Sequence, residues 1–391
     1  MARILLGWEL GAHQGHVSRL VQVADALAED GHEVGLALQN TGFLPSDRLG
    51  AYELFQAPVW PRLLSSNTAL PGPAVASMGD ILVRLGLDQT ETLPALVTGW
   101  HAVFAAFRPH IVIADFSPVM GLAARGRMPV LSVGTGFSCP PADLDFFPVL
   151  TDGEPLFDEA ETLGRANAGL ALIGEKPLSS LPEIFRADRQ LVGSFAMFDP
   201  YFDYRTAALS TPAIADVRPV PAGPLGDEIF VYANERAMRY APLWDGLAAT
   251  NLPVRAHIPA ASPGLISELD RRGIMFEPEK LDFATICKRS RFVLSHGGHG
   301  FVSSALLAAL PQVVVHYDLE KAIIGKAIAD AGVGGHIPLR DIKVEPFASS
   351  LRQLHAASGV HAKVSAMAKQ LHAGLGPGVQ QDILLALPEL L

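Results

Sequence analysis

Residues 291–310 read RFVLSHGGHGFVSSALLAAL. An apolar run that suits a buried strand ends in a glycine-rich turn, and a helix of small residues begins immediately afterwards. Gly297, Gly298 and Gly300 let the backbone bend tightly and approach a ligand closely. The first amides of a helix have no intrahelical partner and carry a partial positive charge, so this turn is suited to bind an anion, usually phosphate. An ordinary strand–loop–helix connection is the alternative for this pattern taken alone.

The composition indicates a compact, soluble protein with more than one domain. Of its 391 residues, 49% are hydrophobic and 18% charged, which is enough to bury the cores of two domains. The formal net charge of -10 argues against nucleic acid and anionic membranes as partners. Two cysteines suit a reducing compartment. Neither the first residues nor the apolar region 93–107 suits a secretory signal or a membrane-spanning helix, so we expect a cytoplasmic protein.

The first forty residues have the pattern of a βαβ unit. A short apolar strand at 3–6 is followed by a loop and by a helix whose apolar residues recur at helical spacing up to Gly31. The next strand is expected at 32–38. Two further strands of this series are expected at 110–115 and 129–133.

A second α/β series follows a region rich in proline, glycine and aromatic residues at 191–224, where we place the linker between two domains. Its strands are expected at 228–232, 254–258, 291–294 and 312–315. The chain is therefore expected to form an amino-terminal domain over 1–215 and a carboxy-terminal domain over 222–391, with the last helix able to pack back on the first domain. Two such parallel sheets facing each other would leave a cleft at the carboxyl ends of their strands, where ligands usually bind.

Three segments resemble the GT-B glycosyltransferases, in particular the family 1 transferases that use nucleotide sugars. The segment 296–300, HGGHG, with the residues after it, resembles the family's donor-binding signature. The dipeptide Gly15-His16 resembles the turn that carries the catalytic base, and 108–115, RPHIVIAD, resembles the segment whose Asp orients that base. The resemblance implies an α/β fold of two Rossmann-like parallel-sheet domains facing across a cleft.

The chain departs from the family's donor signature at three places. Phe301 stands where the family usually has Thr, and Ser304 stands where it has the Glu that binds the ribose hydroxyls. Glu320 and Lys321 replace an Asp-Gln pair that holds the sugar. Capture of phosphate by backbone N–H groups survives these changes, because it needs no particular side chain. The nucleoside and the sugar therefore stay open, with UDP and TDP as the nucleotides that the resemblance suggests.

His16 and Asp115 are predicted to be the catalytic residues. An acceptor hydroxyl must lose its proton as it attacks the anomeric carbon, and a neutral imidazole accepts a proton near pH 7. Asp115 ends an apolar strand, where a buried carboxylate needs a partner. A bond to His16 would fix the tautomer and stabilise the imidazolium. A solvated His at a helix start and a strand-end Asp that caps its own turn are the structural alternatives.

The resemblance also implies a donor site and an acceptor site. Preorganised N–H groups in the glycine-rich turn would stabilise the charge that develops on the leaving diphosphate. The predicted donor contacts are His296, Gly297, Gly298, His299, Gly300, Ser303, Ser304, Glu320, Lys321 and Asn234. Of these, Lys321 suits a solvated helix start better than a donor contact, and Asn234 equally suits a turn. An apolar acceptor is expected to contact Trp8, Leu10 and Phe137, beside the proline- and glycine-broken region 58–100.

We expect no metal and no cofactor, the nucleotide sugar being a co-substrate. His13 and His16 are spaced i, i+3, as are His296 and His299, but no cysteine or acidic cluster completes a zinc site. The Asp-x-Asp at 143–145 lacks the context of a metal-binding fold.

The sequence thus predicts a metal-independent, inverting glycosyltransferase of the hexosyltransferase type. It would move a sugar from a nucleoside-diphosphate sugar to a hydroxyl of a mostly apolar small-molecule or lipid acceptor, as in natural product glycosylation. A nucleotide-sugar hydrolase is one alternative, because residues 15–19, GHVSR, resemble the Gly-His-x-x-Arg turn of hydrolases that share the GT-B fold. A non-catalytic GT-B-like binding protein is another, because the ribose Glu is missing. A homodimer is left open.

Overall fold

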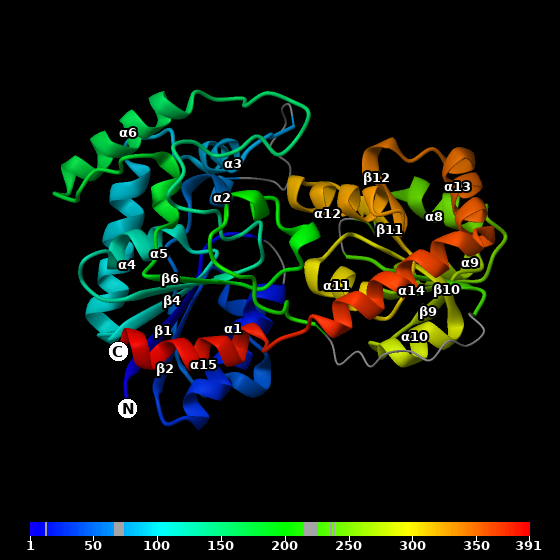
Figure 1. Cartoon of the computed structure of the whole chain (residues 1–391), viewed down its shortest axis with the longest axis horizontal. Coiled ribbons are helices and arrows are strands. Elements are labelled where there is room, and N and C mark those ends of the chain that lie inside the picture. Colours follow the sequence, from blue (N-terminus) through cyan, green and yellow to red (C-terminus); the bar gives the residue numbers. More distant parts are fainter. Residues whose placement is uncertain (12–13, 66–73, 215–225, 235–236, 238) are drawn as a thin grey trace. The chain divides into compact units, whose positions relative to one another are not determined.

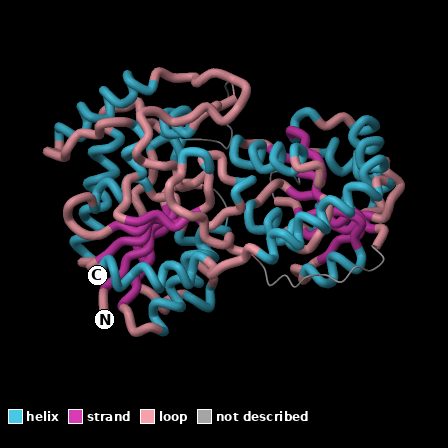
Figure 2. Tube along the Cα trace, viewed as in Figure 1, coloured by secondary structure: helices cyan, strands magenta, loops and turns pink. Residues whose placement is uncertain are grey.

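The computed structural model describes residues 1–391 except 12–13, 66–73, 215–225, 235–236 and 238. The chain divides into two compact units, one formed by Met1–Ala213 with Pro377–Leu391 and the other by Ile214–Gly376. Each unit contains one six-stranded sheet in which neighbouring strands are parallel. Figure 2 shows the strands of each unit, in magenta, between layers of helices. No helix within the described ranges is long and apolar enough to cross a membrane.

The first unit has the strand order β3-β2-β1-β4-β5-β6. Its central strands β1 and β4 are apolar because both of their faces are covered, and Ile4, Leu6, Ile111 and Ile113 are fully buried. Its strands are β1 (Arg3–Trp8), β2 (Glu33–Leu38), β3 (Glu53–Gln56), β4 (Ile111–Asp115), β5 (Val130–Gly134) and β6 (Arg189–Val192). Its helices are α1 (Gln14–Glu29), α2 (Pro61–Ser65), α3 (Met78–Leu85), α4 (Thr92–Phe107), α5 (Pro118–Ala124), α6 (Glu159–Leu172) and α15 (Val379–Leu390).

The last helix of the chain, α15, belongs to the first unit. Ile383 and Leu387 of α15 lie in the same apolar cluster as Leu20 and Leu27 of α1. Figure 1 shows α15, in red, beside the blue helix α1. The carboxy-terminal segment therefore completes the core of the unit that the first residues begin.

The segment 191–213 is also part of the first unit, so placing the linker from 191 onward was wrong. Its first two residues end the edge strand β6, and its aromatic residues serve the core: Phe198 and Tyr201 are 1% and 0% exposed. The Arg205 guanidinium then binds the buried carboxylate of Asp199 and holds the segment in place. Residues 215–224 of the predicted linker lie outside the described residues.

The second unit has the strand order β12-β11-β10-β7-β8-β9. Successive side chains of its strand β7 enter two different apolar clusters, as the twofold repeat of a strand requires. Ile229 and Val231 pack with Leu247 of α8, while Phe230 packs with Ala305 of α11. The strands are β7 (Glu228–Tyr232), β8 (Val254–His257), β9 (Met275–Glu277), β10 (Ser290–Ser295), β11 (Gln312–His316) and β12 (Gly334–Pro338). The helices are α8 (Ala241–Ala248), α9 (Pro263–Arg271), α10 (Phe283–Arg289), α11 (His299–Leu307), α12 (Leu319–Asp330), α13 (Val344–Ala356) and α14 (Ser358–Ala373).

Candidate active site

In the second unit, the glycine-rich turn joins the buried strand β10 to α11. Gly297 has φ 84°, and a Cβ added there would lie 2.7 Å from Cγ1 of Val314 and 3.2 Å from Cβ of Lys321. Gly298 is the N-cap of α11 with an ordinary φ of −62°, and it provides no side-chain cap for the helix. Gly297 therefore makes the turn possible, whereas Gly298 places no side chain of its own over the start of the helix.

The start of α11 offers backbone groups rather than side-chain hydroxyls. His299 and Gly300 are the first two residues of the helix, where amides have no intrahelical acceptor. Ser303 and Ser304 lie one turn further and are 0% and 1% exposed. The Ser304 hydroxyl donates a hydrogen bond to the Gly300 carbonyl at 2.7 Å. The burial of these two serine side chains therefore does not support the prediction that they contact a donor.

Aromatic rings surround the turn where the resemblance leads one to expect polar side chains. Phe301 stacks on Tyr232 at the end of β7, with ring centroids 4.9 Å apart. His296 is 9% exposed and lies 5.4 Å from the same Tyr232 ring. Burial raises the pKa of Tyr232. The side chain at 301 is thus part of an aromatic cluster and not a hydrogen-bonding group.

Lys321 lies against the glycine-rich turn and is not a solvated helix-start lysine. Its side chain is only 11% exposed, and Nζ lies 3.2 Å from a carboxylate oxygen of Asp318 and 3.2 Å from one of Glu320. Burial alone would lower the pKa of Lys321, but the two carboxylates outweigh burial and raise it. Asp318 also caps α12 by accepting from the Lys321 amide. The three side chains form one ion cluster beside the turn.

Asn234 follows β7, and its side chain forms hydrogen bonds within the second unit. Its side-chain oxygen accepts a hydrogen bond from the Ala237 amide at 3.2 Å. Its amide group donates to the hydroxyl of Tyr317, whose ring lies 6.0 Å from Nζ of Lys321. Asn234 therefore links the end of β7 to the residues that follow β11.

In the first unit, His16 and Asp115 are hydrogen-bonded to each other. Asp115 ends β4, which pairs with β1 so that Trp8 and Asp115 are opposite each other, and His16 lies in the first turn of α1. Nδ1 of His16 lies 2.9 Å from Oδ1 of Asp115. Because a carboxylate only accepts, the proton of the neutral ring is on Nδ1, and Nε2 is the nitrogen available as a base.

Arg19 is a third member of this group, and the motif analysis gave it no role in the catalytic pair. Its Nε lies 2.8 Å from Oδ2 of Asp115, and its Nη2 lies 2.6 Å from each carboxylate oxygen. Burial alone would raise the pKa of Asp115, whose side chain is fully buried, but Arg19 and then His16 outweigh burial and lower it. The carboxylate is therefore ionised at neutral pH.

Two aromatic rings stack with the imidazole of His16. Trp8 stacks on it with centroids 5.5 Å apart, and Phe116 stacks at 6.3 Å. Gly11 has φ 91°, and a Cβ added there would lie 2.5 Å from Nε2 of His16. A glycine at this position keeps the space at Nε2 open, while Phe116 itself has a strained φ of 45° directly after Asp115.

The predicted acceptor contacts are more deeply buried than expected. Trp8 and Leu10 are 0% and 1% exposed, and the Trp8 indole donates to the Leu10 carbonyl at 2.5 Å. Phe137 is 7% exposed and packs edge-on against Phe116. Trp8 therefore supports His16 from within the unit, and neither Trp8 nor Leu10 exposes a surface to an acceptor.

Glu9 is a buried carboxylate that the sequence analysis missed. It is 0% exposed and accepts hydrogen bonds from the indoles of Trp60 and Trp100 and from the amides of Val119 and Met120. Burial raises the pKa of Glu9 to about 7, although all four hydrogen bonds lower it. The signal was a lone acidic residue between Trp8 and Leu10 at the end of an apolar strand. Glu9 ties the loop after β1 to the start of α5.

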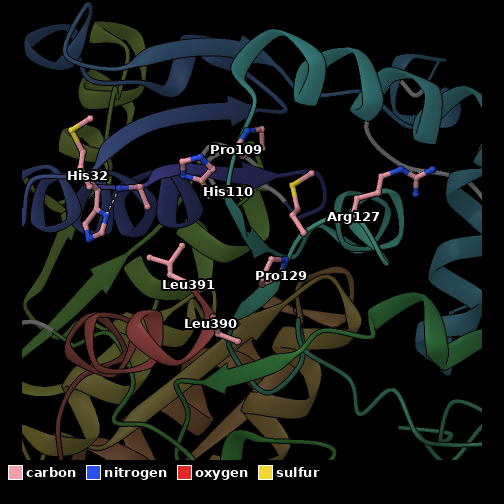
Figure 3. A pocket seen from close by; sticks show the side chains of 10 residues that line it. His32, Pro109, His110, Arg127, Pro129, Leu390 and Leu391 are labelled. Atoms are coloured by element: carbon pink, nitrogen blue, oxygen red, sulfur yellow. Dashed lines mark hydrogen bonds between the residues drawn. The ribbon is translucent and has the colours of Figure 1, made fainter.

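One hollow of the first unit lies away from this group. It measures about 980 Å³ and is open to solvent, and Figure 3 shows His32, His110, Arg127 and Leu391 among the residues that line it. His32, His110 and Arg127 lie shortly before β2, β4 and β5, so the hollow is at the amino ends of the sheet. His16 and Asp115 lie at the carboxyl ends. Within the described ranges, no three His, Cys, Asp or Glu residues are grouped closely enough to hold a metal ion, and His13 lies outside those ranges.

Solved structures share the fold of the whole chain. The calicheamicin glycosyltransferase CalG4 has a TM-score of 0.70 at 18% identity over 98% of both chains. The glycotransferase of kitacinnamycin has a TM-score of 0.67 at 15% identity, covering 100% of this chain and 99% of that one. SsfS6 of Streptomyces sp. SF2575, in complex with thymidine diphosphate, has a TM-score of 0.62 at 15% identity over 98% and 99%. The chain therefore has the two-domain, Rossmann-like GT-B fold of these glycosyltransferases.

Similarity in sequence covers a shorter segment of the chain than similarity in structure. No family model matches the chain. Among curated proteins, UDP-sugar-dependent glycosyltransferase 52 of Dictyostelium discoideum is 30% identical over 105 residues, which are 27% of this chain and 6% of that protein. The chain thus matches only a small part of that relative.

Proposed function

We infer, from a fold shared with glycosyltransferases over the length of the chain, that this protein is a nucleotide-sugar-dependent glycosyltransferase. The observation that carries the inference is the hydrogen bond between His16 and the buried Asp115. It leaves Nε2 of His16 as a base at the carboxyl ends of the strands, where α/β proteins bind substrates.

The proposed step transfers one proton and one glycosyl group. The acceptor hydroxyl gives its proton to Nε2 of His16 while its oxygen forms a bond to the anomeric carbon. The bond from that carbon to the diphosphate oxygen breaks, and the nucleoside diphosphate leaves with the electron pair. Asp115 stabilises the imidazolium through the Nδ1 proton. A single displacement from the face opposite the leaving group inverts the anomeric centre.

The second unit is proposed to hold the donor. The backbone amides at the start of α11, next to Gly298, are suited to bind the diphosphate and to stabilise the negative charge that develops on it. This proposal needs no metal ion. Glu320 and Lys321 are proposed to contact the sugar, since their ion cluster lies beside Gly297. Thymidine diphosphate, present in the SsfS6 complex, and UDP are the first nucleotides to examine.

An apolar acceptor is proposed for the first unit. Rings of Phe116, Phe137, Phe185 and Phe147 contact one another in a continuous series that begins beside His16. These rings are largely buried and give this part of the unit an apolar interior, which suits a hydroxyl-bearing acceptor with flat or apolar surfaces. A hexose as the transferred sugar is part of the same proposal.

Nucleotide binding is the first test. Thermal unfolding is measured with UDP, TDP, GDP, CDP and ADP at equal concentrations. A nucleotide at 100 times its dissociation constant adds about 2.7 kcal/mol to the free energy of unfolding, so one or two of the five are expected to raise the unfolding temperature clearly above the others. The same unfolding temperature with each of the five nucleotides and without nucleotide would contradict a donor site.

A second candidate is hydrolysis of the nucleotide sugar, with water in place of the acceptor. It is favoured by Arg19, which occupies the position of Arg in the hydrolase turn and directly contacts Asp115. The two reactions differ in the fate of the sugar, which is found on the acceptor in one and free in solution in the other.

A further inference from the structure

Arg19 and His16 compete for one carboxylate. They are three residues apart on α1, so their side chains leave the same face of the helix, towards the end of β4. Asp115 receives three contacts of 2.6–2.8 Å from Arg19 and one of 2.9 Å from His16. Nη2 of Arg19 also lies 3.3 Å from Nδ1 of His16. Both of those nitrogens carry protons when Nδ1 donates to Asp115, so they do not bond to each other.

The charges of this group change the proton affinity of the imidazole. With Asp115 alone, proton uptake by His16 would neutralise a negative site. With Arg19 present, the site is neutral before uptake and carries one positive charge afterwards. A like charge within about 4–6 Å disfavours the protonated form of a histidine. The effect is weakly screened, because the side chains of Arg19, His16 and Asp115 are 14%, 17% and 0% exposed.

Other groups around His16 and Asp115 also bear on this charge balance. Trp8 and Phe116, which stack with the His16 ring, are uncharged. Burial raises the pKa of the Cys139 thiol near Asp115, so that thiol is neutral at neutral pH. Glu9, which precedes the loop before α1, is bound to the indoles of Trp60 and Trp100.

We propose that Arg19 is a positioning residue that fixes Asp115 against His16 and offsets the negative charge of that carboxylate. The His16 ring then stays unprotonated, and able to accept a proton, down to a lower pH than it would beside Asp115 alone. The proposal rests on the proposed role of His16 as the base. Arg19 keeps the carboxylate ionised and oriented, and it prevents the imidazole from being protonated before the acceptor arrives.

The test is Arg19→Gln, whose amide still donates to Asp115 but carries no charge. The titration of the His16 ring is followed by NMR in the protein without substrates, and its signal is assigned from its loss in His16→Ala. The midpoint is expected to rise by about one pH unit or more. The acid limb of the kcat/KM profile is expected to move up by the same amount. Arg19→Met is the second variant, with the same expected direction.

Two variants serve as controls. Arg19→Lys keeps the charge without the planar fork, and its midpoint is expected close to that of the unmodified protein. Arg165→Met removes an arginine from the exposed pair with Glu161 on α6, and should leave the midpoint unchanged. A midpoint in folded Arg19→Gln and Arg19→Met within about 0.3 unit of the unmodified protein would overturn the proposal. A raised NMR midpoint with an unmoved kcat/KM profile would support the effect of Arg19 and instead contradict His16 as the base.

Discussion

Replacing His16 by Ala is expected to lower kcat for sugar transfer by about 10²–10⁴ and to leave the fold intact. General-base catalysis accounts for a factor of this size, which corresponds to about 3–5 kcal/mol of transition-state stabilisation. The fold tolerates the change because Asp115 keeps its three contacts with Arg19, so no buried charge loses its partner. Initial rates with a saturating donor, together with a thermal unfolding curve, measure both expectations.

The control for His16→Ala is binding of the nucleotide, whose proposed site is in the second unit. The dissociation constant of the nucleoside diphosphate should be the same in the variant and the unmodified protein. A folded variant that turns over within about threefold of the unmodified protein would remove His16 from the role of base. Asp115→Asn is a poorer probe, because it would leave Arg19 buried without its carboxylate, which costs about 3–5 kcal/mol of stability.

Gly298→Val is expected to weaken nucleotide binding by more than about 100-fold, which is about 2.7 kcal/mol. The β-branched side chain would cover the amides at the start of α11, where the diphosphate is proposed to bind. Stability should change little, since φ −62° and ψ 125° are accessible to any residue and the closest atom to an added Cβ is Nε2 of His296 at 3.1 Å, near the end of a side chain. Titration calorimetry with the nucleotide that stabilises the protein most measures the loss.

The neighbouring glycine supplies the matched control. Gly297→Ala places a Cβ on a residue with φ 84° and within 2.7 Å of Val314, so thermal stability is expected to fall clearly. The two glycines thus separate a binding role from a structural role. Unchanged nucleotide affinity in a folded Gly298→Val protein would contradict the donor site.

The strands that the sequence predicts are those in the middle of each sheet. Strands β1, β2, β4 and β5 and strands β7, β8, β10 and β11 lie close to their expected positions. Strands β3, β6, β9 and β12, which were not predicted, are the edges of the two sheets. A central parallel strand is covered on both faces and needs a continuous apolar run, whereas an edge strand does not. β3 (Glu53–Gln56) is mostly exposed and β12 (Gly334–Pro338) contains two glycines and a proline, so neither has that run.

The parts of the candidate site that the sequence predicts are those in which a motif fixes both the type of residue and its place in a strand, turn or helix. The turn at 297–298 and the pair of His16 and Asp115 belong to this class. The direction of a side chain was not predictable, because it depends on packing between distant segments. Ser304 turns into its own helix, and Lys321 turns towards Asp318 and Glu320 instead of solvent.

Glu9 was overlooked, and Arg19 was noted only as part of the hydrolase-like turn, for a related reason. Each has partners that are far away in the sequence: Trp60, Trp100 and α5 for Glu9, and Asp115 for Arg19. A buried ionisable group signals such partners, but the sequence does not say which they are. Their roles follow only from the contacts.

The fate of the sugar tests the central claim most directly. The protein is incubated with the sugar nucleotide of the best-binding nucleoside diphosphate, with and without a panel of apolar aromatic and polycyclic alcohols, and products are identified by mass spectrometry. We expect nucleotide release to accelerate with an acceptor and each released nucleotide to correspond to one glycosylated acceptor. Release of free sugar at the same rate with and without acceptor, or no turnover with any donor, would contradict the account.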